Sequence, residues 1–210
     1  MMAVRSVSWV ARLFRAIFLF LLRFCLWFAV LLALWWSAGA LLQWPAQAPV
    51  QADAVVVLGG DSGTRYRKGR ALLVDAYSSR LYLINPDLPA LRDIAAGVSN
   101  LHEVHGEAIS RSTWDEAVNT LAWMKANDVG HVLVVSDPPH ILRVAYSWSS
   151  VFRGSGRHYT LVAAEPPWWS AWRWWENEQA ALFAGIEVLK LGYYLVRYRF
   201  GFLLEDMGSE

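Results

Sequence analysis

Short apolar runs along the chain alternate with longer segments in which apolar residues recur at helical spacing. Runs at 54–58, 80–84 and 131–136 are bounded by Gly, Pro, Asn or Asp, and they predict buried β-strands. Shorter runs predict two further strands at 101–104 and 159–163. Because strands of a covered parallel sheet are buried on both sides, these continuous runs favour a mostly parallel sheet.

Helices are expected between and after these strands, at 64–77, 88–96, 113–127, 138–152 and 174–197. The alternation of strands and helices predicts an α/β fold, namely a Rossmann-like three-layer domain with a mostly parallel sheet. In open sheets of this kind, ligands bind beyond the carboxyl ends of the strands. The loops that follow the strands are therefore the candidate site.

The N-terminal segment combines arginines with a long uncharged stretch. Residues 24–42 carry only apolar or small side chains, and a helix of this length crosses most of a hydrocarbon core about 30 Å thick. We predict one transmembrane helix here. Four arginines and no acidic residue precede it: Arg5, Arg12, Arg15 and Arg23. This asymmetry predicts a cytoplasmic N-terminus, 1–23, and a domain on the far side of the membrane. A cleaved signal peptide and a buried core helix are the alternatives.

Composition defines the remaining boundaries. Residues 43–52 contain two prolines and predict a short extended linker, 53–200 form the α/β domain, and 201–210 form a tail. The formal net charge of +1 argues against a nucleic-acid partner. The single cysteine, Cys25, lies in the predicted membrane helix, which excludes disulfides, thiolate metal sites and cysteine nucleophiles from the domain.

Three segments with chemically useful side chains are expected at the carboxyl edge of the sheet. The first is the turn Gly59-Gly60-Asp61, which leads into a helix that carries Arg67. Free N–H groups at a helix N-terminus, together with nearby guanidinium groups, favour an anion such as phosphate. The other two segments contribute hydroxyl, carboxylate, imidazole and guanidinium groups: Glu107, Ser110, Ser112, Thr113, Ser136, His140 and Arg143.

A proton-transfer site can be built from this set. His140 and Arg143 stand three positions apart at the start of a predicted helix and share one face. Asp137 is near enough in the sequence to orient the imidazole. Arg143 and Arg67 can hold a phosphate while Glu107 or His140 serves as general acid or base.

Structural roles remain open for part of the set. Ser112 or Thr113 can simply cap the helix that follows, and His140 can bond to the local backbone. His102 and His105 alternate along a predicted strand without a fourth defined ligand, so we expect them to face solvent and predict no metal site.

Four motifs in order resemble the YdcF-like family, whose membrane-anchored members include the SanA and ElyC proteins of the bacterial envelope. They are a strand ending in Leu-Gly-Gly, an Arg four residues before an Ala, Glu-x-x-Ser-x-Ser-Thr, and a strand ending in Ser followed by His-x-x-Arg, all within about 53–152. Two positions depart from the family pattern. Asn85-Pro86-Asp87 replaces a Ser-Gly-Gly type of turn, and Glu116 replaces the usual Asn.

The resemblance implies a bacterial inner-membrane protein with a periplasmic domain and a function in cell-envelope and peptidoglycan biogenesis. The expected activity is binding or processing of a phosphate-bearing ligand, either lipid-linked or nucleotide-like, with envelope-assembly proteins as further partners. A non-catalytic envelope scaffold or ligand-binding factor is the alternative. The resemblance also implies S-adenosylmethionine binding, which ranks third because a periplasmic domain rarely meets that compound. The residues themselves identify no cofactor.

Two expectations concern the C-terminal part. The run 168–175 contains five tryptophans, and we predict that it contacts the lipid bilayer, with a sugar-stacking surface and core packing as alternatives. In the helix that follows, Glu176, Glu187 and Lys190 are expected to face water. The apolar residues at helical spacing are expected to lie on the sheet: Ala181, Leu182, Gly185, Ile186, Leu189 and Tyr193.

Overall fold

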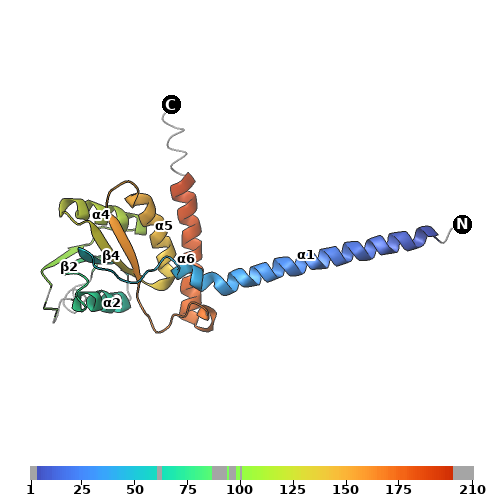
Figure 1. Ribbon diagram of the computed structural model, residues 1–210, viewed down its shortest axis with the longest axis horizontal. Helices are drawn as coiled ribbons and strands as arrows, with labels where there is room; N and C mark the ends of the chain where they lie inside the picture. The colour runs from blue at the N-terminus through green and yellow to red at the C-terminus, as the bar shows by residue number, and fades with distance from the viewer. Residues whose placement is uncertain (1–3, 61–62, 87–93, 95–97, 100, 201–210) are drawn as a thin grey trace, which may run out of the picture. The chain divides into compact units, whose positions relative to one another are not determined.

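The chain forms two compact units in the computed structural model, which describes residues 4–60, 63–86, 94, 98–99 and 101–200. The first unit, Met1–Ala38, contains most of helix α1, Val4–Gln43 (Figure 1). Within α1, the stretch Trp9–Gln43 is long and apolar enough to cross a membrane. The helix begins well upstream of the predicted run 24–42, because arginine is a good helix former and does not interrupt the backbone.

The second unit, Gly39–Glu210, is built on a five-stranded parallel sheet with the order β3-β2-β1-β4-β5. The strands are Ala54–Val57, Arg80–Ile84, Glu103–Glu107, His131–Ser136 and His158–Ala163, numbered β1 to β5. The chain extends the sheet from β1 through β2 to β3, and then returns to place β4 on the other side of β1. The strand order therefore reverses between β1 and β4, as in doubly wound folds.

Helices cover both faces of the sheet, with α2 on one face and α4 and α5 on the other (Figure 1). Their bounds are Gly63–Val74, Thr113–Ala126 and Ile141–Phe152. Val55 and Val57 of β1 pack with Leu72 of α2, whereas Val56 belongs to the core cluster that contains Trp148 of α5. Alternate side chains of this buried strand thus pack into two different cores, one on each face of the sheet. The predicted three-layer α/β fold is confirmed.

The predicted strands agree with the structure except at one edge. Strands expected at 54–58, 80–84, 131–136 and 159–163 are present with at most one residue of difference. The strand expected at 101–104 is instead Glu103–Glu107, an edge strand whose three central residues are exposed and give no apolar signal. The helix expected at 88–96 lies outside the described residues, apart from buried Ile94.

The segment before β1 is packed onto the domain. Leu42, near the end of α1, is buried, and the backbone N–H of Gln47 donates a hydrogen bond of 2.7 Å to the carbonyl of Leu161 in β5. The compact unit accordingly begins at Gly39, upstream of the predicted linker 43–52.

The C-terminal helix presents a different face from the one expected. A 3-10 turn, η2, covers Trp174–Glu176, followed by α6, Glu178–Tyr194, and a π-helical turn, η3, Leu195–Phe200. Glu187 is only 4% exposed, whereas Leu189 is 75% exposed. The prediction that Glu187 faces water is wrong, because its carboxylate pairs with a buried arginine of α5.

The tryptophan run before α6 is only partly at the surface. Trp172 is exposed, but Trp174 is buried, and the side chains of Trp168 and Trp169 are half-buried. Trp168 packs against Phe183 of α6 with ring centroids 5.3 Å apart. Core packing therefore accounts for part of the run.

Candidate functional site

The point where the strand order reverses is crossed by a buried ion pair. Arg65 of α2 donates from Nε to Asp137 Oδ2 at 2.8 Å, and its Nη2 lies 2.8 Å from the same oxygen. Its Nη1 donates to the carbonyl of Gly59, which follows β1. Asp137 directly follows β4 and precedes the 3-10 turn η1, Pro138–His140. The loops after β1 and β4 are thus held together at the carboxyl edge of the sheet.

Close packing of α2 on β1 explains why Arg65 reaches this edge. A Cβ atom at Gly69 would lie 2.5 Å from Cγ2 of Val57, so the helix can approach the strand only with glycine there. Arg65 stands one turn earlier on the same buried side. Arg67, the predicted ligand, is exposed on α2, and its Nη1 lies 3.6 Å from the Cβ position of Gly63 at the helix N-terminus. Arg65, the buried arginine, was not among the predicted site residues.

The glycine turn requires its glycines for two different reasons. Gly60 has φ +115°, a conformation that residues with a side chain rarely adopt. A Cβ atom on Gly59 would lie 2.8 Å from the carbonyl oxygen of Ile84 in the neighbouring strand. Asp61, the third predicted residue of the turn, lies outside the described residues.

His140 is buried between two hydroxyl groups. Its Nδ1 lies 2.8 Å from Ser136 Oγ, and its Nε2 lies 3.1 Å from Thr113 Oγ1. Burial, reinforced by nearby guanidinium groups, lowers the pKa of His140 well below its ordinary value, so the ring is neutral at neutral pH. Asp137 does not orient this ring as expected, since its carboxylate pairs with Arg65. The contact at Nδ1 comes from Ser136 instead.

Arg143 connects the histidine to α6. It donates from Nε and Nη2 to the carboxylate of Glu187, at 2.7 and 3.0 Å, and from Nη1 to Thr113 Oγ1. Because a guanidinium has only donors, Thr113 Oγ1 accepts from Arg143 and is free to donate its own proton to His140. The Thr113 N–H donates to the hydroxyl of Tyr194 at 3.1 Å. The Thr113 hydroxyl thus lies between the neutral imidazole of His140 and the guanidinium of Arg143.

Ser112 and Thr113 have separate roles. Ser112 is the N-cap of α4, and its Oγ accepts from the N–H of Asp115 at 3.1 Å. The capping role considered for Ser112 is therefore present, while the side chain of Thr113, one residue later, points into the buried group.

Glu116 lies among the charged residues Arg65, Arg143 and Glu107. In the sequence it stood out only because the YdcF-like motif usually has Asn at this position. Its carboxylate accepts a hydrogen bond from the backbone of Gly59, and within the described part of the chain no group hydrogen-bonds its buried Oε2. Burial raises the pKa of Glu116 to about 7; Arg65 and Arg143 oppose the rise, and Glu107 adds to it. Its carboxyl group therefore changes protonation state near neutral pH.

Glu107 and Ser110 form a neighbouring polar group. Glu107, the last residue of β3, accepts from the hydroxyl of Ser110 and, at 3.1 Å, from the N–H of Ile109. Asn119 of α4 donates to Ser110 Oγ at 2.9 Å, and Asn85 donates to the Ser110 carbonyl at 2.7 Å. The position of Asn85 shows that the unusual turn after β2 forms part of this edge.

The structure thus brings most of the predicted site residues to the carboxyl edge of the sheet. They differ in burial and in the residues that they contact. Hydrogen bonds join four buried residues: Thr113, Ser136, His140 and Arg143. Half-buried Gly59 hydrogen-bonds with Arg65 and Glu116. Glu107 and Ser110 lie beside them, and Arg67 is at the surface. No three His, Cys, Asp or Glu side chains within the described ranges are grouped so as to hold a metal ion.

Comparisons of the chain with models of known protein families, with curated proteins and with solved structures gave no match.

Proposed function

We propose that the chain is a membrane-anchored, YdcF-like protein whose periplasmic α/β domain binds or processes a phosphate-bearing ligand in cell-envelope and peptidoglycan biogenesis. The ligand is lipid-linked or nucleotide-like. Support for an anion comes from the turn at Gly60, the N-terminus of α2 and the exposed guanidinium of Arg67 beside Gly63. Arginine in α1 on the N-terminal side of an uncharged stretch supports the orientation.

The observation that carries the proposal is the buried Oε2 of Glu116 next to Gly59, which has no hydrogen-bond partner among the described residues. Thr120 Oγ1 and Trp148 Nε1 share this property, but Glu116 combines it with a shifted pKa, and shifted pKa values cluster at functional sites. Its pKa of about 7 allows Glu116 to give a proton to a phosphate oxygen at neutral pH and to take it back afterwards. Neutral His140 hydrogen-bonds with the Thr113 hydroxyl in the same group.

The test uses the full chain in lipid nanodiscs with two probes, a polyprenyl diphosphate and a nucleoside diphosphate sugar. Phosphate release and the masses of the products are measured for wild type, Glu116→Gln and His140→Ala. We expect one probe to be converted, and each variant to lower kcat about 100-fold, the usual size of a general acid–base contribution. Glu178→Gln, an exposed glutamate at the start of α6, is the matched control and should react like wild type.

A ligand-binding factor without catalysis is the second candidate. It is favoured by the pairing of both buried arginines, Arg65 with Asp137 and Arg143 with Glu187, which fits a static structural role. In that case a probe binds at equal strength to wild type and to His140→Ala, and its mass never changes. If neither probe binds to the wild-type chain, the phosphate proposal fails in both forms.

The orientation is tested separately. A reporter that is active only outside the cytoplasm, fused after Glu210, should be active. Activity of a cytoplasm-specific reporter at the same position would contradict the periplasmic assignment.

A further inference from the structure

Helix α6 and the turn after it carry an apolar stripe on the side that faces away from the domain. Five residues recur at intervals of three or four and therefore share one side of the helix. They are between 38% and 75% exposed: Leu182, Ile186, Leu189, Tyr193 and Val196. We call this set the outer stripe.

The opposite side of α6 holds small and polar residues, and it is fixed to the domain. Ala180 and Ala184 are buried, Glu187 pairs with Arg143 of α5, and Tyr194 accepts from the N–H of Thr113. This distribution is the reverse of that on a helix covering a soluble core, where the apolar side is buried. Rotating α6 to bury the outer stripe would separate the buried guanidinium of Arg143 from its counter-ion, Glu187.

The segment Glu178–Tyr198 is long and apolar enough to cross a membrane by length and composition. A spanning role would require Glu187 and Tyr194 to leave their partners and enter hydrocarbon. The contacts of the inner side therefore indicate that α6 stays on the domain, so that only its outer stripe can contact a membrane.

The start of α6 is joined to the end of α1 by the tryptophan run, within the compact unit that begins at Gly39. Trp168 packs on Phe183 of α6, and Trp169 Nε1 donates to Gln43 Oε1 at 2.7 Å. Gln43 is the last residue of α1, the helix that is able to cross a membrane. The outer stripe thus begins beside the point at which the chain would emerge from the bilayer.

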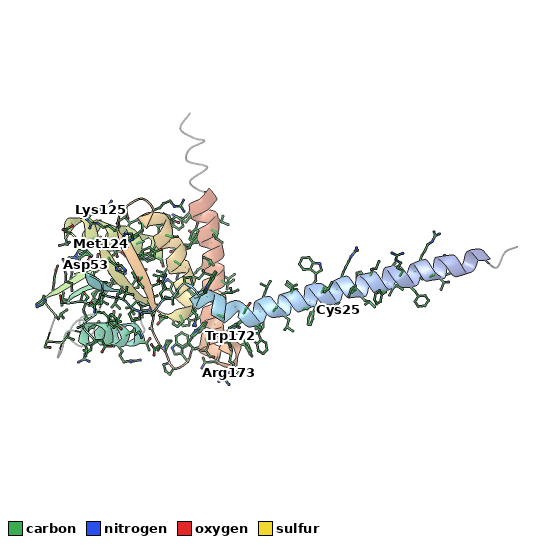
Figure 2. All side chains as sticks on the ribbon, viewed as in Figure 1. Cys25, Asp53, Met124, Lys125, Trp172 and Arg173 are labelled. Atoms are coloured by element: carbon green, nitrogen blue, oxygen red, sulfur yellow. The ribbon has the colours of Figure 1, made fainter. Side chains whose placement is uncertain are left out.

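We propose that the outer stripe of α6 lies in the interfacial layer of the lipid bilayer, next to the exit point of α1. Aliphatic and tyrosyl side chains on one side of a helix, with cationic groups at its borders, are typical of helices that lie in the membrane plane. Exposed Trp172 and Arg173 lie at the turn before α6 (Figure 2), and Arg197, beyond its end, lies over the ring of Tyr193. Trp172 and Arg197 suit the headgroup zone, and Arg173 pairs with exposed Glu176 at 3.6 Å. The contact of Trp169 with the last residue of α1, a helix able to cross a membrane, favours lipid over a second copy of the chain.

The test measures depth in the membrane, because α1 alone would keep the chain bound to lipid. In a Cys25→Ser background, which removes the only cysteine, Leu189→Cys and Leu182→Cys each receive a fluorescent label. Both positions are exposed, so labelling leaves the core intact. Val118→Cys, an exposed apolar position on α4, is the matched control. The chain is reconstituted in phosphatidylethanolamine–phosphatidylglycerol vesicles that contain lipids with a nitroxide at either a shallow or a deep acyl carbon.

We expect the shallow nitroxide to quench both stripe labels several-fold more strongly than the control label, with weaker quenching by the deep nitroxide. Quenching equal to the control would overturn the proposal. A second measurement identifies a protein occupant: with spin labels at position 189 on all copies, strong dipolar coupling between copies without lipid quenching would show that the stripe binds a second chain, and this also overturns the proposal.

Discussion

Replacing Glu116 with Gln should stabilise the domain at alkaline pH and leave it almost unchanged in acid. Burial raises the pKa of Glu116 from 4.5 to about 7, so the folded chain holds this proton more tightly than the unfolded chain. Below pH 4.5 both states are protonated and the group contributes no difference. As pH rises towards 7, the unfolded chain loses the proton first, and folding is progressively disfavoured. The full effect is about 3 kcal/mol, at about 1.4 kcal/mol for each pH unit between the two pKa values.

The assay is urea unfolding of the full chain in detergent, followed by tryptophan fluorescence at a series of pH values from about 4.5 to about 8. The free energy of unfolding of Glu116→Gln minus that of wild type should grow by about 3 kcal/mol across this range. Glu178→Gln removes an exposed carboxylate of the same charge and should show no such growth. A difference between Glu116→Gln and wild type that stays constant with pH would refute the reasoning, because it would place the Glu116 carboxylate in an environment that solvates it.

Three further predictions concern packing, a buried hydrogen bond and the histidine. Gly69→Ala should lower the free energy of unfolding by about 1–3 kcal/mol in urea titrations, because the new Cβ overlaps Val57; an unchanged midpoint would show that α2 can move away. Tyr194→Phe keeps the ring but leaves the N–H of Thr113 without its acceptor and should cost about 1–3 kcal/mol, whereas Tyr193→Phe removes an exposed hydroxyl and should cost less; equal losses from the two variants would contradict the role given to the Tyr194 hydroxyl. The pKa of His140 is lowered, so its contribution to stability is present above pH 6.5 and is lost as pH falls; His140→Gln should therefore lose less thermal stability on acidification than wild type, and parallel losses would contradict the assignment.

The layers of the fold are readable from the sequence because the central strands are apolar on both sides. β1 and β4 consist almost entirely of buried aliphatic residues, and no other local structure suits such a run between turn signals. β3 was misplaced because an edge strand with exposed His105 and Gly106 has little apolar pattern. The orientation of α6 was predicted wrongly for a different reason. Periodicity locates an apolar side of a helix, but it does not say whether protein or another apolar medium covers that side.

The site was predictable as a set of loops but not as a set of contacts. Thr113, Ser136, His140 and Arg143 meet because the topology brings the carboxyl ends of the strands together. The residues packed around them are brought there by tertiary structure, which local sequence patterns hardly predict: Arg65, Glu116, Glu187 and Tyr194. Glu187 offers one usable signal, an acidic residue in the middle of an apolar helix, which is costly unless a buried cation faces it.

The ion pair between Arg65 and Asp137 has a consequence for any anion that approaches this edge. Asp137 is tethered to the same fold as the guanidinium it contacts, so its carboxylate competes with free anions at a high effective concentration. A monovalent ion such as chloride or acetate should exchange poorly with it.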